Sequence, residues 1–439
     1  MNLKKANSIL KEALEMIKPP EGDLKNAEIY LKKYKDILEQ RIKKLKVDAE
    51  IFVGGSFSKK TFIKKEDYDI DVFIRFDQKY TEKEISNIAG KIVNGLDNLS
   101  LVHGSRDYFK IKPSRNISIE LIPVLKVKKP SEARNITDLS YSHVNYINKK
   151  IKSQAMLEEI ILAKSFCYFN NCYGAESYIR GFSGYSLELL VYYYGSFLKM
   201  LKGLSKNMKG EKIIIDIEKN FKDKKEILMN LNSSKLESPV ILIDPTYKQR
   251  NTLAALSKET FERFKSAARD FLKTPSINAF EIKKTDLQEI KSKAKKNGFE
   301  YILLEARTNK QEGDIAGSKL LKFYKHLEKE ISRFFEVKGR GFDYDNKSSA
   351  KYYYAAKSRK DILITGPSVD DTEHSKEFKK IHKNYFIKNG RLYSKEKIKF
   401  NIKEFIDGLK KKNNLQIKEM YITGLRIIDF SPEHSLKGG

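Results

Sequence analysis

The spacing of apolar residues over the first third of the chain predicts a mixed α/β domain. Apolar side chains recur at helical spacing on both sides of Pro19-Pro20, and a short apolar run leads into Gly54-Gly55-Ser56. Two later segments alternate between apolar and polar residues with a period of two, which is typical of strands. The predicted elements are helices over residues 2–17 and 22–46 and strands over residues 49–53, 69–76 and 117–124. We expect this domain to end near residue 145.

The pattern changes twice further along the chain. From Ser153 to about Leu204 it is helical, in two segments separated by glycine-rich breaks at residues 173–175 and 181–184, and a strand at 240–243 and another helix follow. After Pro275, helices and strands alternate again. The elements predicted there are a helix beginning after Thr285, whose hydroxyl would cap it, a strand at 299–306, a helix at about 314–335, and strands near 351–356 and 361–365.

These segments define the predicted fold class, a multi-domain α/β (α+β) protein. We expect a mixed α/β head at residues 1–145 and a mainly helical central domain at residues 146–275. An α/β body should follow at residues 276–369, and a lysine-rich tail, helical in parts, at residues 370–439. A chain of 439 residues is long enough for several such cores.

Composition favours a basic intracellular protein that binds polyanions. Lysine and arginine outnumber aspartate and glutamate by 86 to 58, a formal charge of +28, which attracts nucleic acid first of all. Drift of an AT-rich genome towards lysine and isoleucine is the alternative explanation. The two cysteines, Cys167 and Cys172, form neither a disulfide framework nor a zinc site and are interpreted as idle thiols in a reducing cytosol. Because no window reaches the ~18 apolar residues of a membrane span, we expect a cytoplasmic protein without membrane contact.

Candidate chemistry starts with Asp69 and Asp71, two carboxylates on one face of the predicted strand at 69–76. Carboxylates at alternate strand positions project in parallel and can share divalent cations such as Mg²⁺. Glu120, the lone acid on the polar face of the strand at 117–124, is the candidate third ligand. Together they would form a two-metal site suited to phosphoryl or nucleotidyl transfer. The alternative is that the acid pair lies on a solvated face.

The turn before this strand supplies a candidate phosphate site. Gly55 and Ser56 offer free backbone N–H groups and a hydroxyl at the start of a short helix, which suits a triphosphate. Nearby lysines add countercharge: Lys59, Lys60, Lys64 and Lys65. The order strand, Gly-Ser, short helix, D-x-D strand and later acidic strand resembles the nucleotidyltransferase palm of the polymerase β-like superfamily. The palm alone leaves the acceptor open.

Two motifs of the central region narrow the resemblance. The segment "YGAESYIRGFSGYSLELLVYYYGSF" at residues 173–197 resembles the central-domain motif of archaeal class I CCA-adding enzymes, which are tRNA nucleotidyltransferases. The segment "DPTYKQRN" at residues 244–251 is similar to a further motif of that family, and "FIKNGRLYS" at residues 386–394 matches it more loosely. The resemblance covers essentially the whole chain.

The resemblance implies the substrates and a role for each site residue. The enzyme would add CCA to the 3′ end of tRNA from CTP and ATP, contacting the acceptor and T arms, with two Mg²⁺ ions or Mn²⁺ as an alternative. Asp69, Asp71 and Glu120 would be catalytic metal ligands. The implied nucleotide-binding residues are Gly55, Ser56, Lys59, His143, Lys164, Tyr173 and Arg250. Ser56, Lys164 and Tyr173 would hold the triphosphate, His143 would line that pocket, and Arg250 would face the base, because a guanidinium's fixed donors suit the acceptor edges of cytosine and adenine.

One departure from the family and several alternatives stay open. The family's third carboxylate is usually aspartate, and the extra methylene of Glu120 moves it by roughly 1.5 Å. The alternatives are another RNA 3′-terminal nucleotidyltransferase of the poly(A) polymerase or oligoadenylate synthetase type, and a catalytically weak RNA-binding relative. A protein-modifying nucleotidyltransferase of the toxin–antitoxin type is disfavoured by the length of the chain. A homodimer is one alternative for the oligomeric state.

Overall fold

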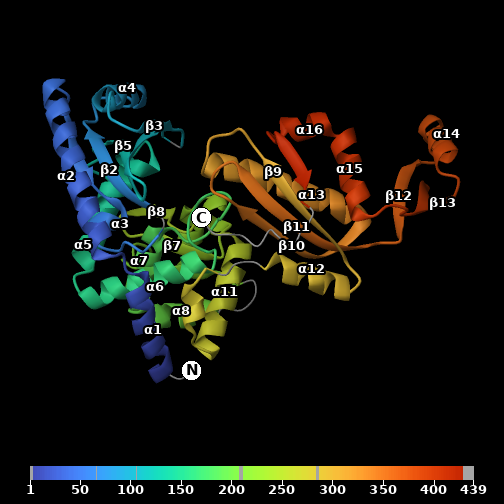
Figure 1. The fold of residues 1–439 in the computed structure, drawn as a ribbon, viewed down its shortest axis with the longest axis horizontal. Helices are drawn as coiled ribbons and strands as arrows, with labels where there is room; N and C mark the ends of the chain where they lie inside the picture. Colours follow the sequence, from blue (N-terminus) through green and yellow to red (C-terminus); the bar gives the residue numbers. More distant parts are fainter. Residues whose placement is uncertain (1–2, 66, 105, 207–210, 283–285, 429–439) are drawn as a thin grey trace. The chain divides into compact units, whose positions relative to one another are not determined.

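The computed structural model describes residues 3–65, 67–104, 106–206, 211–282 and 286–428. It contains two compact units, residues 1–283 and residues 284–439 (Figure 1). Within the described ranges, no helix is long and apolar enough to cross a membrane.

The head is built on a five-stranded sheet. Its strand order is β1-β2-β5-β4-β3, with β2 and β5 parallel and the other neighbours antiparallel. The strands are β1 (Ala49–Val53), β2 (Tyr68–Phe76), β3 (Leu99–Val102), β4 (Tyr108–Ser114) and β5 (Ile117–Leu125). The predicted strands at 49–53, 69–76 and 117–124 are thereby confirmed, whereas β3 and β4 were not predicted.

Two helices cover the apolar face of this sheet, α2 (Glu21–Lys44) and α4 (Glu82–Val93) (Figure 1). The period of two in β2 decides which face they cover, because Ile70 and Val72 point into this core while Asp69 and Asp71 point to the opposite face. Helix α4 begins at a capping box in which Thr81 and Glu84 satisfy each other's backbone N–H groups. The apolar face of the sheet therefore forms the core of the head, and the opposite face presents the two acidic side chains.

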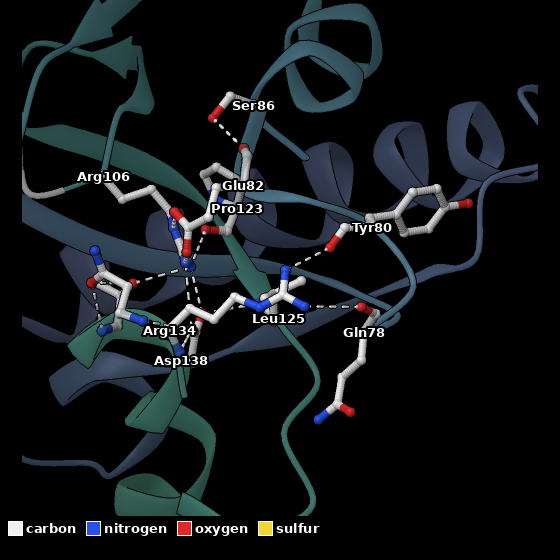
Figure 2. A network of polar contacts seen from close by, with 11 residues as sticks. Gln78, Tyr80, Glu82, Ser86, Arg106, Pro123, Leu125, Arg134 and Asp138 are labelled. Carbon is white, nitrogen blue, oxygen red and sulfur yellow. Dashed lines mark hydrogen bonds and ion pairs between the residues drawn. The ribbon is translucent and has the colours of Figure 1, made fainter. Parts of the chain in front are cut away.

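A buried arginine network closes one edge of the head (Figure 2). The guanidinium of Arg106 is 2% exposed and pairs with Asp138 and with Glu82, the first residue of α4. It also donates to the Pro123 carbonyl at 3.2 Å, while Asp138 accepts from the Leu125 backbone N–H at 2.9 Å. Because Pro123 and Leu125 end β5, this network fixes the strand that carries Glu120.

The central part of the same unit is mainly helical, as predicted. Its helices pack around Phe166 and Phe264 with the N-terminal helix α1 (Leu3–Ile17), which contributes Leu10 and Ala13. The other helices are α5 (Ser140–Lys150), α6 (Gln154–Phe169), α7 (Gly184–Tyr194), α8 (Phe197–Ser205) and α11 (Lys258–Lys273). The second predicted helical segment is in fact two helices, because Gly195 takes a φ of +80° after α7 and Ser196 caps α8.

A small sheet in this region carries part of the candidate site. It has the order β6-β7-β8 and lies beside two short helices. These elements are β6 (Ile213–Ile215), β7 (Val240–Asp244), β8 (Tyr247–Asn251), α9 (Lys224–Asn230) and α10 (Ser233–Leu236). The predicted strand at 240–243 corresponds to β7, and the turn at Asp244-Pro245 leads into β8. Short 3₁₀ helices occur at Pro130–Glu132, Ile136–Leu139 and Ile277–Phe280.

The second unit has a four-stranded antiparallel sheet of order β10-β11-β9-β15, packed on the long helix α13 (Asp314–Phe334). Buried Tyr352 and Tyr354 donate their hydroxyls to the Leu320 and Tyr324 carbonyls of α13. The strands are β9 (Glu300–Arg307), β10 (Phe335–Tyr344), β11 (Ser349–Ser358) and β15 (Gly424–Ile427). Helix α12 (Leu287–Lys296) is capped by Asp286, while the predicted cap Thr285 lies outside the described residues.

The lysine-rich segment contains a hairpin as well as helices. Strands β12 (Asp361–Ser368), β14 (Arg391–Lys397) and β13 (Tyr385–Lys388) form a sheet in that order. The helices are α14 (Thr372–Ile381), α15 (Ile402–Lys412) and α16 (Asn414–Glu419). The tail expected at residues 370–439 does contain helices in its described part, as predicted, and the hairpin was missed. The boundaries at residues 145, 275 and 369 stay predictions.

Candidate active site

The three acidic side chains predicted to bind metal lie on neighbouring strands of the head sheet. Asp69 and Asp71 belong to β2, and the parallel pairing of β2 with β5 sets Asp71 directly beside Glu120. On the other side of β5, Lys110 of β4 pairs with Glu120. The sheet therefore places Asp71, Glu120 and Lys110 in one row across three strands, with Asp69 two positions before Asp71 on the same face of β2.

Burial and mutual repulsion shape the charge of these acids. Burial, together with the charge of Asp69, raises the pKa of Asp71 to about 6. Burial and the charges of Asp71 and Asp69 raise the pKa of Glu120 to about 7. Although burial opposes it, the Asp69 carboxylate raises the pKa of Lys110, whose ammonium lies 2.7 Å from Asp69 Oδ1 and 3.5 Å from Glu120 Oε1. Carboxylates crowded in this way favour a bound cation, because a positive charge removes their mutual repulsion.

The donor types suit a divalent cation, although in this arrangement a protein ammonium bridges two of the acids. In the described ranges, no three His, Cys, Asp or Glu side chains converge closely enough to hold a metal ion. The ammonium of Lys110 instead links Asp69 to Glu120 across two strands. Carboxylate oxygens are the ligands that Mg²⁺ and Mn²⁺ prefer, so Asp69, Asp71 and Glu120 have the right chemistry and the right strand positions to bind such an ion.

Gly55 lies against the carboxylate of Asp71. The predicted short helix is present as α3 (Gly55–Ser58), and Gly55 begins it with a φ of +62°. A Cβ atom at Gly55 would lie 1.7 Å from Asp71 Oδ2, and the Gly54 N–H donates to the Asp71 carbonyl at 2.9 Å. Only glycine fits here. The Gly-Ser turn is thus held beside the acids, and Ser56, the next residue, is half-buried at the same edge.

A buried ion cluster joins two of the predicted phosphate-binding lysines. Lys59 and Lys164 each place an ammonium 2.7 Å from a different oxygen of Glu188, whose side chain is fully buried. Thr61 donates to Glu188 at 3.1 Å and accepts from Lys164 at 2.7 Å. Burial lowers the pKa of Lys164 to about 8, and although burial opposes it, the two lysines hold the pKa of Glu188 below its usual value. The two cations therefore share one carboxylate and keep a net positive charge.

Tyr173 lies close to this cluster. A Cβ atom at Gly184, the first residue of α7, would lie 3.0 Å from Tyr173 Oη and 3.6 Å from Lys164 Nζ. The Lys65 ammonium lies 5.3 Å from the centre of the Tyr173 ring. Backbone pairing of Tyr173 with Phe182 holds the turn between α6 and α7. The glycine-rich breaks predicted in this region are therefore the turn that brings Tyr173 beside Lys164.

A second buried acid, Asp244, gathers His143 and Arg250. Asp244 Oδ2 lies 2.9 Å from His143 Nε2 and 2.8 Å from Arg250 Nη1. Its other oxygen accepts from the Tyr185 hydroxyl at 3.1 Å and from the Thr246 backbone N–H at 2.8 Å. Although burial opposes it, His143 and Arg250 hold the pKa of Asp244 well below its usual range, while burial lowers the pKa of His143. The carboxylate is therefore a charged anchor for both side chains.

These contacts show which predicted residues meet. Gly55 joins the acids, Lys59 and Lys164 meet at Glu188, and His143 and Arg250 meet at Asp244. The Glu188 and Asp244 clusters are linked, because the Lys59 ammonium lies 5.9 Å from the centre of the Tyr185 ring, which stacks on His143 at 4.1 Å. Lys60 and Lys64 are exposed and take no part in the three clusters.

Three site residues were missed by the sequence analysis: Lys110, Glu188 and Asp244. A signal existed for Glu188, a lone acid between Leu187 and Leu189 in a helix that is apolar all round. Asp244 was noticed only as the first residue of a turn and of the family-like segment at residues 244–251, with no role of its own. Lys110 had no signal, because the partners that give it a role come from other strands.

Comparison with known proteins places this geometry in a family. A model described as "Nucleotidyltransferase domain" matches residues 31–141, and one described as "tRNA nucleotidyltransferase, second domain" matches residues 158–281. The CCA-adding enzyme of Nanoarchaeum equitans is 32% identical over 392 residues, which cover 88% of this chain and 92% of that protein. This chain belongs to the CCA-adding enzyme family. The CCA-adding enzyme of Methanocaldococcus jannaschii is 29% identical over 88% of this chain and 86% of its own length.

The two family models that match this CCA-adding enzyme relative cover different parts of the site. The segment matched as a nucleotidyltransferase domain contains the three acids and Gly55, and it confirms the predicted fold class of the head. The segment matched as the second domain contains Lys164, Glu188 and Asp244. Among solved structures, that of the Cid1 poly(U) polymerase is 14% identical over 64% of this chain and all of that chain, with a TM-score of 0.49. The family-model match makes the chain a nucleotidyltransferase, and the two relatives named above come from archaea.

Proposed function

We propose that this protein adds CCA to the 3′ end of tRNA from CTP and ATP, without a nucleic-acid template and with release of pyrophosphate. The observation that supports this proposal most directly is that Asp71 and Glu120 lie side by side on paired strands, with Asp69 on the same face. The chain that holds them belongs to the CCA-adding enzyme family. Two carboxylates on one strand and a third on the neighbouring strand can hold the pair of metal ions that in-line nucleotidyl transfer uses. The high positive charge suits a tRNA substrate.

Enzymes of this family use divalent metal ions, and we assign two Mg²⁺ ions to Asp69, Asp71 and Glu120. When bound, such ions lower the pKa of the attacking 3′-hydroxyl and neutralise charge on the triphosphate. The chain's own part is to orient the ligands: β2 and β5 fix their spacing, and Gly55 leaves room for the Asp71 carboxylate. Glu120, longer than aspartate, reaches from the neighbouring strand into the same row.

The nucleotide would be held by the two clusters around this row. Ser56 and the net positive charge of the Lys59–Lys164–Glu188 cluster favour a triphosphate at the Gly-Ser turn. The Lys59 ammonium bonds to Glu188 through one of its three N–H donors, so it can also donate to a phosphate, whereas Lys164 bonds to both Glu188 and Thr61. Arg250, oriented by Asp244 with His143, would present its remaining guanidinium N–H groups to the base.

The test is nucleotide addition to a tRNA that ends at its discriminator base. The wild-type protein should extend it by three nucleotides with CTP and ATP together, by two with CTP alone, and by none with ATP alone. Asp71→Asn should lose extension while retaining tRNA affinity in a filter-binding assay. Continued growth beyond three nucleotides with ATP alone would point to a poly(A) polymerase type instead, and full activity of Asp71→Asn would refute the assignment of the site.

A further inference from the structure

Lys110 occupies a position where its positive charge conflicts with a bound metal ion. Its ammonium lies 2.7 Å from Asp69 Oδ1 and 3.5 Å from Glu120 Oε1, so it bridges acids of two different strands. Of the Lys, Arg and His side chains in the described ranges, it is the one within ion-pair distance of either acid. We infer that Lys110 is a built-in counter-ion of the carboxylate site, which a divalent cation must displace, and that it thereby weakens metal binding.

The pairing of β4 with β5 fixes the backbone of Lys110 beside Glu120. Lys110 pairs with Glu120 in the antiparallel ladder of β4 and β5, and its backbone cannot move away without breaking that ladder. The side chain itself can move, because it is about one-third exposed and has four rotatable carbons. The groups that act on the ammonium are the carboxylates of Asp69 and Glu120 and the phenol of Tyr108. None of them supplies a second positive charge.

The physical conflict follows from Coulomb's law. A dication bound between the acids would place two positive charges within a few ångströms of the Lys110 ammonium, and like charges at that distance repel even when partly screened. Metal binding must therefore either move the ammonium towards solvent or accept the repulsion. In both cases the measured affinity is lower than that of the same three acids without the lysine. This inference rests on the proposed function in one respect, the assignment of Asp69, Asp71 and Glu120 as metal ligands.

The experiment is titration of the full-length protein with Mn²⁺, without RNA or nucleotide, by calorimetry and by electron paramagnetic resonance of free Mn²⁺. Lys110→Gln removes the charge and keeps a polar side chain. Removing a unit charge at this distance should tighten Mn²⁺ binding by on the order of tenfold. Lys110→Arg keeps the charge and should bind Mn²⁺ as the wild-type protein does.

Lys112 provides a matched control. It lies two residues further along β4 and pairs with Asp67 at 3.6 Å. Lys112→Gln removes the same unit charge from the same strand but leaves the three acids untouched. It should leave the Mn²⁺ affinity within about twofold of wild type, because an exposed charge is screened. Equal tightening in both variants would show a general charge effect and overturn the specific role of Lys110.

Two other outcomes overturn the inference. Unchanged or weaker Mn²⁺ binding by Lys110→Gln would mean that the lysine orders the acids rather than competing with metal. Absence of Mn²⁺ binding in wild type and variant alike would remove the competition altogether. The proposed function is judged separately, by extension of tRNA with CTP and ATP, so its failure and that of the inference are distinguishable.

Discussion

The buried cluster of Lys59, Lys164 and Glu188 makes a strong prediction about stability. Glu188→Gln keeps the shape of the side chain and removes the single negative charge that two ammonium groups share at 2.7 Å each. Removing one partner of a buried ion pair leaves an uncompensated charge, which typically costs about 3–5 kcal/mol. We therefore expect the free energy of unfolding to fall by about that amount at neutral pH.

Deprotonation of Lys164 limits how far the free energy of unfolding of Glu188→Gln can fall. Lys164 already has a pKa of about 8 because of burial, below the usual 10.5. Without Glu188, which raises that pKa, it falls further, and Lys164 can escape the penalty by losing its proton. Bringing a lysine from its usual pKa to neutral pH costs about 5 kcal/mol, which sets the upper limit for this side chain.

The sign of the pH dependence follows from the same shift. Between the folded and unfolded pKa values of Lys164 the unfolded chain binds more protons, so stability rises with pH in that window. In the wild-type protein the window begins at about 8, and in Glu188→Gln it begins lower. The deficit of the variant should therefore shrink as the pH rises from 6 to 8, by at most about 1.4 kcal/mol per pH unit.

Urea unfolding at pH 6, 7 and 8, followed by circular dichroism, measures this deficit. Glu158→Gln is the control, since its pair with Lys18 has the same 2.7 Å distance but is partly exposed, and its loss should stay below about 1 kcal/mol. If Glu188→Gln unfolds at the wild-type urea concentration, or if its deficit is the same at all three pH values, the account of the cluster is wrong.

Three further predictions concern activity and tRNA binding. Asp244→Asn removes the charge that holds His143 and Arg250, so we expect KM for CTP and ATP to rise by roughly tenfold and misincorporation to increase in single-nucleotide assays. Gly55→Ala forces a Cβ into the Asp71 carboxylate, and nucleotide addition should fall by roughly 100-fold. The affinity for tRNA, measured by filter binding, should fall at least about 100-fold between about 50 and 200 mM salt.

The two substitutions each have a control within the chain. Glu218→Gln also removes a carboxylate that bonds to α5, through Tyr146 and Lys150, and should leave KM unchanged. Gly22→Ala adds a methyl group with no atom within 4 Å and should keep full activity. An unchanged KM in Asp244→Asn, an active Gly55→Ala protein, or tRNA binding insensitive to salt would each contradict its prediction.

The parts of the fold that could be predicted are those whose burial leaves a local pattern of apolar and polar residues in the sequence. The alternation at Ile70 and Val72 identified β2 and its two faces, because burial of every second residue leaves a direct trace in the sequence. The β13–β14 hairpin was missed in a lysine-dense segment, although Asn389 and Gly390, both with positive φ, form the turn that an Asn-Gly pair favours. That signal was available and was outweighed by composition.

The site was predictable where the residue type itself carries the chemistry. Asp69 and Asp71 stand out on one strand, but the pairing of Asp71 with Glu120 depends on a parallel register between segments about fifty residues apart. Lys110 joins them only through a second register. Glu188 meets Lys59 across 129 positions of sequence. Such contacts are set by how the core packs, and no local spacing reveals them.

In a chain with a net charge of +28, buried acids determine which cations are held in place. Glu188 fixes Lys59 and Lys164, and Asp244 fixes Arg250 with His143, so these cations sit at set positions around the carboxylate row. The remaining lysines are mostly on the surface, where a cation lacks a fixed direction and acts as countercharge for a polyanion. Reducing surface lysines should therefore weaken tRNA binding while nucleotide choice persists, whereas losing either buried acid should disturb nucleotide handling before it weakens tRNA binding.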